Sequence, residues 1–288
     1  MIDLKLKRPD VDVIDELISR AFQEDIRDGD ITTNAIIGED QQAAAVWQAK
    51  ESGIIAGLDI ARAVFKALDP ELEWHPRVED GDRVEIGQDI VEMEGTCRAI
   101  LTAERTALNL AQRLSGIATK THQLVEAIAD YPTKILDTRK TVPGLRQLDK
   151  YAVSAGGGTN HRMGLFDMAL IKDNHIVAAG GIVSAVELVR AQHPEVQIEV
   201  ETTSLEEVRK ALEAGADMIM LDNMNTQMMR EAVNLIGEKA KTEASGNITL
   251  KRIKEVAETG VAYISVGALT HSVKAFDISQ RLSKIYQK

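Results

Sequence analysis

Cationic side chains gather in one segment of this acidic chain, between Asp137 and His175. Some stand just beyond a short apolar run, at 134–137 or 168–171, and the others lie between the two runs. These side chains are Arg139, Lys140, His161, Arg162 and Lys172. The formal net charge is -11, so the chain has concentrated its positive charge here. Neighbouring cations repel unless an anion neutralises them, and the segment therefore predicts an anion-binding site.

The residue types narrow the chemistry of that anion. A guanidinium group such as Arg139 or Arg162 binds a planar carboxylate through two parallel hydrogen bonds. Lys140 and Lys172 act better as point charges toward phosphate. Any one of these cations alone is more often part of a surface ion pair, but a set of them at strand ends favours a ligand. We expect one substrate with carboxylates and a second that is phosphorylated.

Two carboxylates follow neighbouring apolar strands and should face the same cavity. Glu201 and Asp222 there can bind ribose hydroxyls, serve as acid and base, or lie in the outer coordination sphere of Mg²⁺. The alternative is an internal ion pair with Lys140 or Lys172, which could coexist with such a role. The pair therefore predicts two carboxylates facing one cavity at the strand ends.

Small residues follow the last two predicted strands, just ahead of helices. Backbone N–H groups at such positions bind phosphate, and the phosphate site of many β/α barrels lies after their last strands. The predicted phosphate-binding residues are Lys140, Ser245, Gly246, Asn247, Ser265, Gly267 and Ala268. Gly156–Gly158 lacks the strand and helix context of a dinucleotide fingerprint.

The elements that must position these residues alternate through the second half of the chain. Apolar runs occur at 135–136, 169–171, 198–200, 218–221 and 263–266, and helical patterns at 183–191, 205–214, 225–236 and 250–258. This alternation predicts βαβ units and a parallel sheet. We expect an α/β fold, an open β/α barrel of six to seven parallel strands, with its chemistry at the C-terminal ends of the strands.

The first hundred residues predict a small α+β, sandwich-like domain. Amphipathic patterns favour helices at 11–22 and 58–68. Strands are expected at 45–50, 52–57, 83–86 and 90–93. We place the N-terminal domain at 1–115 and the barrel domain, which is catalytic, at 116–271, with a C-terminal helix at 272–288 packed on the first.

A long helix from about 99 to 129 links the two halves and carries Arg105 and Arg113. On pattern alone, both arginines are expected on a solvated face. The composition excludes several function classes. A pI of about 5.1 disfavours nucleic acid as a partner, and no apolar run approaches a membrane span. One cysteine, Cys97, allows no internal disulfide, and we expect a cytoplasmic protein.

Several long motifs resemble the quinolinate phosphoribosyltransferase family. They are Arg139-Lys-Thr-Val-Pro-Gly-Leu-Arg146, Gly156-Gly-Gly-Thr-Asn-His-Arg162, Lys172-Asp-Asn-His175, Leu221-Asp-Asn223 and Ser265-Val-Gly-Ala-Leu269. The resemblance covers nearly the whole chain. It implies phosphoribosyl transfer from phosphoribosyl pyrophosphate to quinolinate with decarboxylation, giving nicotinate mononucleotide, CO₂ and pyrophosphate for de novo NAD biosynthesis. It also implies Mg²⁺ and a homodimer with shared active sites, and leaves open further assembly into a hexamer.

The resemblance assigns roles to the residues that match the family motifs. The quinolinate-binding residues would be Thr138, Arg139, His161, Arg162 and Lys172, with Arg105 reaching in from the partner subunit. The catalytic residues would be Lys140, which contacts phosphoribosyl pyrophosphate, and Glu201 and Asp222, which address the ribose hydroxyls and the metal through water or substrate. The phosphate-binding assignments above are unchanged.

The chain departs from the family pattern in two places. Val142 stands where a second threonine is usual, and Ala262 and Tyr263 stand where an aspartate is common. Neither departure removes a residue assigned to chemistry. Rival interpretations are a paralogous phosphoribosyltransferase-like enzyme with another substrate, and a Schiff-base lyase using Lys172. An anion-binding or carrier module built on the first hundred residues is a third, but it lacks an attachment lysine.

Overall fold

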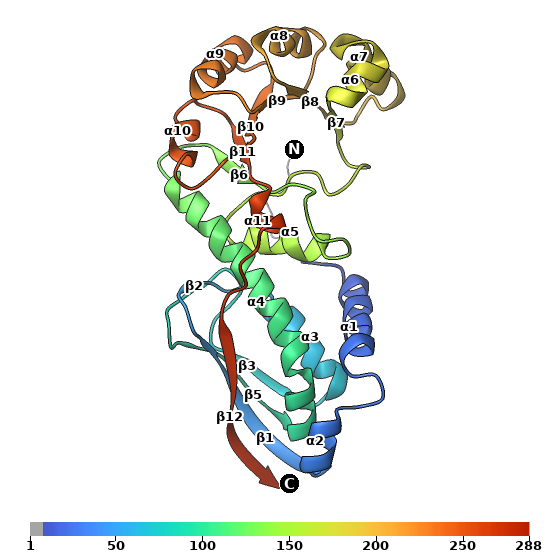
Figure 1. Ribbon diagram of the computed structural model, residues 1–288, viewed down its shortest axis with the longest axis vertical. Helices are drawn as coiled ribbons and strands as arrows, with labels where there is room; N and C mark the ends of the chain where they lie inside the picture. Colours follow the sequence, from blue (N-terminus) through green and yellow to red (C-terminus); the bar gives the residue numbers. More distant parts are fainter. Residues whose placement is uncertain (1–7, 288) are drawn as a thin grey trace. The chain divides into compact units, whose positions relative to one another are not determined.

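The computed structural model describes residues 8–287, which form two compact units, each built around its own main sheet (Figure 1). The barrel unit comprises Thr121–Arg146 and Gly158–His271. The sandwich unit comprises residues 8–120, Gln147–Gly157 and residues 272–287. None of the described helices is long and apolar enough to cross a membrane.

A six-stranded parallel sheet forms the centre of the barrel unit. In space its strands follow the order β6, β11, β10, β9, β8, β7. Their bounds are β6 Lys134–Leu136, β7 Ala169–Ile171, β8 Ile198–Thr202, β9 Met218–Asp222, β10 Lys241–Ser245 and β11 Tyr263–Ser265. Within the described residues no ladder joins β6 to β7, so the barrel is open. The predicted open β/α barrel is confirmed.

Helices of the barrel unit follow its strands, and all but the short α11 cover the outer side of the sheet (Figure 1). They are α6 Asp173–Ala179, α7 Ile182–Gln192, α8 Leu205–Glu213, α9 Thr226–Ile236, α10 Ile253–Ala257 and α11 Ala268–His271. Ser204 caps α8 by accepting the N–H of Glu207 at 3.3 Å. Asn225 caps α9 by accepting the N–H of Met228 at 2.9 Å. The two caps fix the residue at which the loop after the strand ends and the helix begins.

The sandwich unit contains a four-stranded antiparallel sheet in the order β12, β1, β5, β3, and a two-stranded ladder of β2 and β4. The strands are β1 Gln41–Ala49, β2 Gly53–Ile54, β3 Glu73–Pro76, β4 Arg83–Val84, β5 Asp89–Thr96 and β12 Ile278–Gln287. The helices are α1 Val11–Asp25, α2 Ile31–Ile36, α3 Leu58–Leu68, α4 Cys97–Ala127 and α5 Arg146–Ala155. Trp47 anchors the core, with the rings of Phe65 and Trp74 at 5.9 and 5.8 Å.

The predicted C-terminal helix at 272–288 is wrong. Residues 278–287 form β12, which pairs antiparallel with β1 from Ala49 opposite Ile278 to Gln41 opposite Gln287. Ile278 is buried in the core of the sandwich unit and Leu282 packs against that core. These two apolar residues are four apart, a spacing that suits one face of a helix as well as one face of a strand. Pairing with β1 decides between them, and β1 lies more than two hundred residues away in the sequence.

Arg113 also differs from its prediction. Its Nε and Nη2 donate to the two carboxylate oxygens of Asp149 at 2.9 and 2.8 Å, which joins α4 to α5 within the sandwich unit. Asp149 is fully buried and the Arg113 side chain is 22% exposed, so this arginine serves the fold and does not face solvent.

Candidate active site

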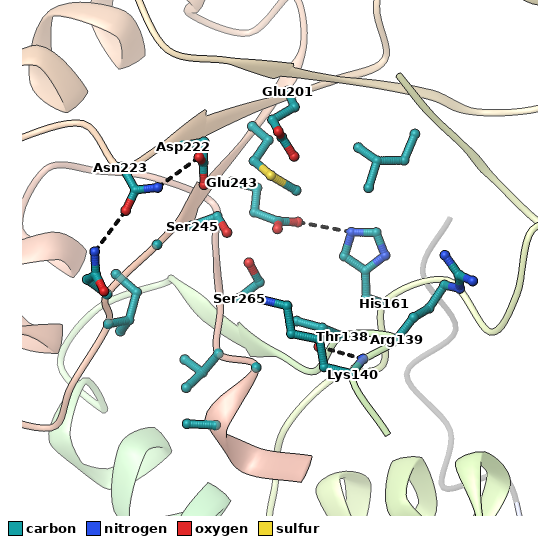
Figure 2. A pocket seen from close by; sticks show the side chains of 18 of the residues that line it. Thr138, Arg139, Lys140, His161, Glu201, Asp222, Asn223, Glu243, Ser245 and Ser265 are labelled. Carbon is teal, nitrogen blue, oxygen red and sulfur yellow. Dashed lines mark hydrogen bonds and ion pairs between the residues drawn. The ribbon is translucent and has the colours of Figure 1, made fainter. Parts of the chain in front are cut away.

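The carboxyl ends of the barrel strands surround a pocket of about 880 Å³, within the size range of small-molecule sites (Figure 2). Every site residue predicted in the barrel unit lines it. These are Thr138, Arg139, Lys140, His161, Arg162, Lys172, Glu201, Asp222, Ser245, Gly246, Asn247, Ser265, Gly267 and Ala268. Arg105 belongs to the sandwich unit, where it is exposed on α4. The individual roles of these residues stay predictions.

One buried carboxylate, Asp137, holds together the two segments that carry the cations. It follows β6 directly, immediately before Thr138, and it is completely buried. Its Oδ1 accepts the N–H of His161 at 2.9 Å, and its Oδ2 accepts Asn160 Nδ2 at 2.6 Å. Charge-assisted hydrogen bonds of this kind are strong, so the relative placement of Arg139 and His161 is fixed by the fold.

The loop that bears Arg139 and Lys140 is fastened from both sides. Arg146 Nη2 donates to the carbonyl of Arg139 at 3.4 Å, and Arg146 Nε donates to Thr141 Oγ1 at 3.1 Å. Thr270 Oγ1 donates to the carbonyl of Lys140 at 3.0 Å. The backbone is therefore fixed through its carbonyls while Arg139 and Lys140 line the pocket with their side chains (Figure 2).

The two pocket guanidinium groups lie close enough to disturb each other. Burial lowers the pKa of Arg162 below its ordinary value, and the positive charge of Arg139 lowers it further. Arg162 Nη1 donates to the carbonyl of Met168 at 3.0 Å. Arg139 Nε is buried and finds no hydrogen-bond partner among the described residues. A bound carboxylate would satisfy that donor and relieve the repulsion between the two cations.

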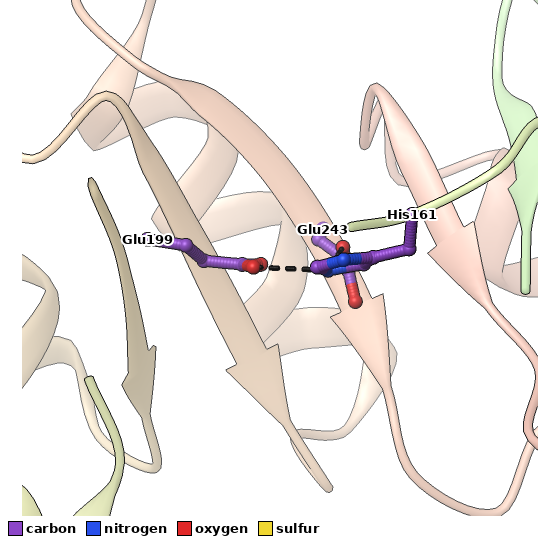
Figure 3. A group of neighbouring side chains, drawn as sticks. All are labelled: His161, Glu199 and Glu243. Carbon is purple, nitrogen blue, oxygen red and sulfur yellow. Dashed lines mark hydrogen bonds and ion pairs between the residues drawn. The ribbon is translucent and has the colours of Figure 1, made fainter. Parts of the chain in front are cut away.

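His161 lies against two buried glutamates that sequence reasoning missed (Figure 3). Its Nε2 is 3.0 Å from Glu199 Oε2 and 3.3 Å from Glu243 Oε2, and its Nδ1 accepts the N–H of Arg162 at 2.7 Å. Burial opposes protonation of the ring, but the two carboxylates outweigh it and raise the pKa of His161. The contact at Nδ1 acts against this, because it fills the position of a second ring proton.

The same three residues offer ligand atoms within 4.8 Å of one another, so they form a group that could hold a metal ion. Burial, and then the charge of Glu243, raise the pKa of Glu199. A signal for both glutamates exists in the sequence. Alternation along a strand places Glu199 on the same face as Glu201, and Glu243 on the same face as Ser245.

The opposite side of the pocket carries the two predicted strand-end carboxylates. The carboxylate of Glu201 forms an ion pair with Lys172 Nζ, so the internal pairing considered for this residue does occur. Asp222 Oδ2 accepts Asn223 Nδ2 at 2.8 Å. Asn223 Oδ1 in turn accepts Asn247 Nδ2 at 3.0 Å (Figure 2). A chain of polar side chains thus connects Asp222 to the loop after β10.

That loop is shaped for close approach to a ligand. Gly246 has a φ of +94°, and a Cβ atom there would lie 2.2 Å from Asn223 Oδ1, so only glycine fits. Across the pocket, a Cβ on Gly267 would lie 3.0 Å from Lys140 Cδ. Ser265 Oγ is buried and has no hydrogen-bond partner among the described residues. Two glycine backbone segments that carry no side chain, together with the Ser265 hydroxyl, form a cradle suited to phosphate.

Neither departure from the family pattern reaches the chemistry of this pocket. Val142 is 41% exposed. Ala262 contributes its backbone, since its N–H donates to Thr242 Oγ1 at 2.9 Å and its carbonyl accepts the N–H of Lys134 at 3.0 Å.

Comparison with known proteins identifies the family. The family model for the C-terminal domain of quinolinate phosphoribosyl transferase matches residues 117–281, and the model for its N-terminal domain matches residues 30–115. The chain belongs to the quinolinate phosphoribosyltransferase family. Members of this family are phosphoribosyltransferases, and the protein is therefore an enzyme of that class.

Relatives agree along nearly the whole length. A probable nicotinate-nucleotide pyrophosphorylase [carboxylating] from Bacillus subtilis (strain 168) is 49% identical over 265 residues, covering 92% of this chain and 91% of the relative. A mitochondrial quinolinate phosphoribosyltransferase [decarboxylating] 2 from Nicotiana glauca is 46% identical over 289 residues, covering 93% and 81%. The solved nicotinate-nucleotide pyrophosphorylase from Francisella tularensis is 43% identical with a TM-score of 0.94, covering 97% and 99%.

Proposed function

We propose that the protein transfers the phosphoribosyl group of phosphoribosyl pyrophosphate to quinolinate and releases CO₂, giving nicotinate mononucleotide and pyrophosphate for de novo NAD biosynthesis. One observation carries the proposal. A single pocket divides into a half lined by Arg139, His161, Arg162 and Lys172 and a half lined by Glu201, Asp222 and two glycine loops. The first half suits two carboxylates on a planar ring, and the second suits a phosphorylated sugar.

In the cationic half, Arg139 and Arg162 would bind the adjacent carboxylates of quinolinate through paired hydrogen bonds. Lys172 adds a point charge beside them, and Thr138 borders the same surface. Nicotinate, with one carboxylate, would leave part of this positive charge unpaired in a partly buried site. The arrangement therefore favours quinolinate over nicotinate by electrostatics.

In the other half, Lys140 and the loops at Gly246 and Gly267 would hold the phosphate groups, together with Ser245, Asn247, Ser265 and Ala268. Glu201 and Asp222 would accept hydrogen bonds from the ribose hydroxyls. Their negative charge stabilises the positive charge that develops on the ribosyl carbon as pyrophosphate leaves.

The residues present fit magnesium bound chiefly by substrate. Glu201 and Asp222 are oxygen donors, which Mg²⁺ prefers, but Lys172 already pairs with the first and Asn223 with the second. Two engaged carboxylates do not make a full protein cage, so they would reach the ion through water or substrate oxygens. When bound, magnesium neutralises charge on the pyrophosphate.

The chemistry would proceed in two steps. The pyridine nitrogen forms a bond to the anomeric carbon of the ribose while the bond from that carbon to pyrophosphate breaks. The bond to the carboxylate beside the ring nitrogen then breaks, CO₂ leaves, and its electron pair stays on the ring carbon, which takes up a proton from water. The protein contributes mainly position and electrostatics.

A Schiff-base lyase has less support. It would need Lys172 to be desolvated and uncharged. Instead, the Lys172 amine contacts the carboxylate of Glu201 and its side chain is 45% exposed.

The decisive assay offers quinolinate, phosphoribosyl pyrophosphate and Mg²⁺ to the purified protein, with nicotinate in a parallel reaction. Nicotinate mononucleotide and CO₂ from quinolinate alone are expected. A paralogous enzyme with another substrate would give no product in either tube. Equal conversion of nicotinate would contradict the proposed specificity for a dicarboxylate.

We further propose a homodimer with shared sites, in which Arg105 of the partner subunit completes the cationic half, and we leave hexamers open. We place the enzyme in the cytoplasm, since Cys97 is its single cysteine and is buried. Its acidic composition disfavours nucleic acid as a partner.

A further inference from the structure

Two fully buried carboxylates lie within the barrel sheet, and the proposed chemistry uses neither, although one of them, Glu243, also borders the pocket (Figure 2). Glu199 comes from β8 and Glu243 from β10, the strands on either side of β9. Both are 0% exposed. Both carboxylates lie against the ring of His161, at 3.0 and 3.3 Å from its Nε2 (Figure 3). Two acidic side chains buried next to each other are unfavourable for folding, so a functional role is expected for them.

The fold does not satisfy these groups. Among residues 8–287, Glu199 Oε1 and both carboxylate oxygens of Glu243 have no hydrogen-bond partner. The contact between Glu243 Oε2 and His161, at 3.3 Å, lacks the alignment of a hydrogen bond. Burying polar atoms without partners destabilises a fold, and two neighbouring carboxylates add repulsion. Glu199 and Glu243 therefore lower the free energy of unfolding.

Glu199 and Glu243 contribute to holding the His161 ring in place. Its Nε2 faces both carboxylates, its Nδ1 accepts the N–H of Arg162, and its own backbone N–H is held by Asp137. Contacts on both ring nitrogens and on the backbone leave the imidazole one orientation. That ring borders the half of the pocket that carries Arg139 and Arg162.

We propose that Glu199 and Glu243 are positioning residues that fix the His161 ring as a rigid wall of the carboxylate-binding half, at the expense of fold stability. The inference rests on the proposed function and deepens it, because the wall shapes the pocket for the dicarboxylate ring and leaves the phosphoribosyl half unaffected. Holding a binding surface in its bound geometry before the ligand arrives improves affinity without adding a contact.

The first test is Glu243→Gln, which keeps the shape of the side chain and removes its charge. The KM for quinolinate should rise about tenfold or more, because the ring gains freedom, whereas the KM for phosphoribosyl pyrophosphate should stay within about twofold. The melting temperature should stay level or rise. Glu199→Gln is made in parallel and should behave alike, so the test does not depend on one variant folding.

The matched control is Asp149→Asn, because Asp149 is equally buried but fully paired with Arg113. It should lower the melting temperature and leave the KM for quinolinate unchanged. A melting temperature that falls in the glutamate variants, with both KM values rising together, would show a merely structural role and overturn the inference.

A double-mutant cycle with His161→Ala tests whether the glutamates act through the ring. In that background Glu243→Gln should change the KM for quinolinate by less than about twofold, because its target is gone. Independent, multiplicative effects would reject the inference. So would stoichiometric metal in the purified wild-type protein that is lost from Glu243→Gln, since the carboxylates would then be ligands.

The wild-type assay separates this inference from the proposed function. If wild-type protein does not convert quinolinate, the proposed function fails. If it does, and both glutamate variants keep the wild-type KM, only the positioning role fails.

Discussion

Arg139 lines the pocket, and its Nε is buried without a hydrogen-bond partner in the part of the chain that the structure describes. We expect Arg139→Ala to raise the KM for quinolinate about 100-fold, because a charged contact whose partner is left unpaired costs about 2–5 kcal/mol. The KM for phosphoribosyl pyrophosphate should change by no more than a few-fold. Steady-state kinetics with each substrate varied in turn measures both.

Arg209 provides the control for that experiment, because it is an exposed arginine on α8 of the same unit. Arg209→Ala should leave both KM values unchanged. If Arg139→Ala raised the two KM values equally, its effect would come from displacement of the loop that also carries Lys140, and the assignment of Arg139 to quinolinate would fail.

Asn223 connects Asp222 to the loop after β10, and it does so in a left-handed conformation with a φ of 54°. Asn223→Gly keeps that conformation and removes both side-chain hydrogen bonds. Each is worth about 1 kcal/mol, so the KM for phosphoribosyl pyrophosphate should rise about tenfold or more while that for quinolinate stays within twofold.

Asn223→Ala separates backbone strain from these hydrogen bonds. It should show the same kinetic change and in addition lose about 1 kcal/mol of stability, because alanine disfavours the left-handed region. A glycine variant with wild-type kinetics would mean that the orientation of Asp222 does not depend on Asn223.

At the scale of elements, the Arg113–Asp149 pair joins α4 to α5 inside the sandwich unit. Arg113→Ala would leave Asp149 buried without its charge partner, which typically costs about 3–5 kcal/mol. Urea denaturation should show that loss in the free energy of unfolding. Arg113→Ala together with Asp149→Leu should recover part of it, and no recovery would mean that packing of the arginine stem, not the buried charge, accounts for the effect.

Elements with a strong local pattern could be predicted, and elements that depend on distant partners could not. β8 and β9 carry apolar runs, and α8 carries its own cap, so their sequences specify them. A strand is expected just before Gly246, but its bounds could not be read from the sequence, because β10 reads Lys-Thr-Glu-Ala-Ser and has no apolar run. Its pairing with β9 and β11 defines it. The sequence of β12 is compatible with a helix or a strand, and its pairing with the edge of β1 makes it a strand.

At the scale of the whole molecule, some site residues could likewise be predicted from the sequence and others could not. Residues at strand ends could be placed in one pocket from sequence because parallel strands of a barrel share a rim. Glu199 and Glu243 could not, since their importance lies in a meeting with His161 that requires three-dimensional coordinates. The role of Arg105 follows neither from its sequence pattern nor from the structure of one chain, because its proposed partner is a second copy of the chain.

That proposal can be tested by mixing subunits. Arg105→Ala and Lys172→Ala would each inactivate a homodimer, since every site would lack one cation for quinolinate. If Arg105 acts in the partner's site, a mixed dimer contains one site that lacks both cations and one intact site. Mixing the two inactive variants after dissociation should then restore up to about one quarter of wild-type activity. That limit assumes random pairing, which puts half of the dimers in the mixed state with half of their sites intact.

The control is a mixture of Arg139→Ala with Lys172→Ala, whose residues belong to the same barrel unit and line the same pocket. Every mixed dimer then has one defect in each site, so no activity should return. Recovery in the Arg105 mixture alone supports a shared site. Equal recovery in both mixtures, or in neither, would place Arg105 in the site of its own subunit or outside the site altogether.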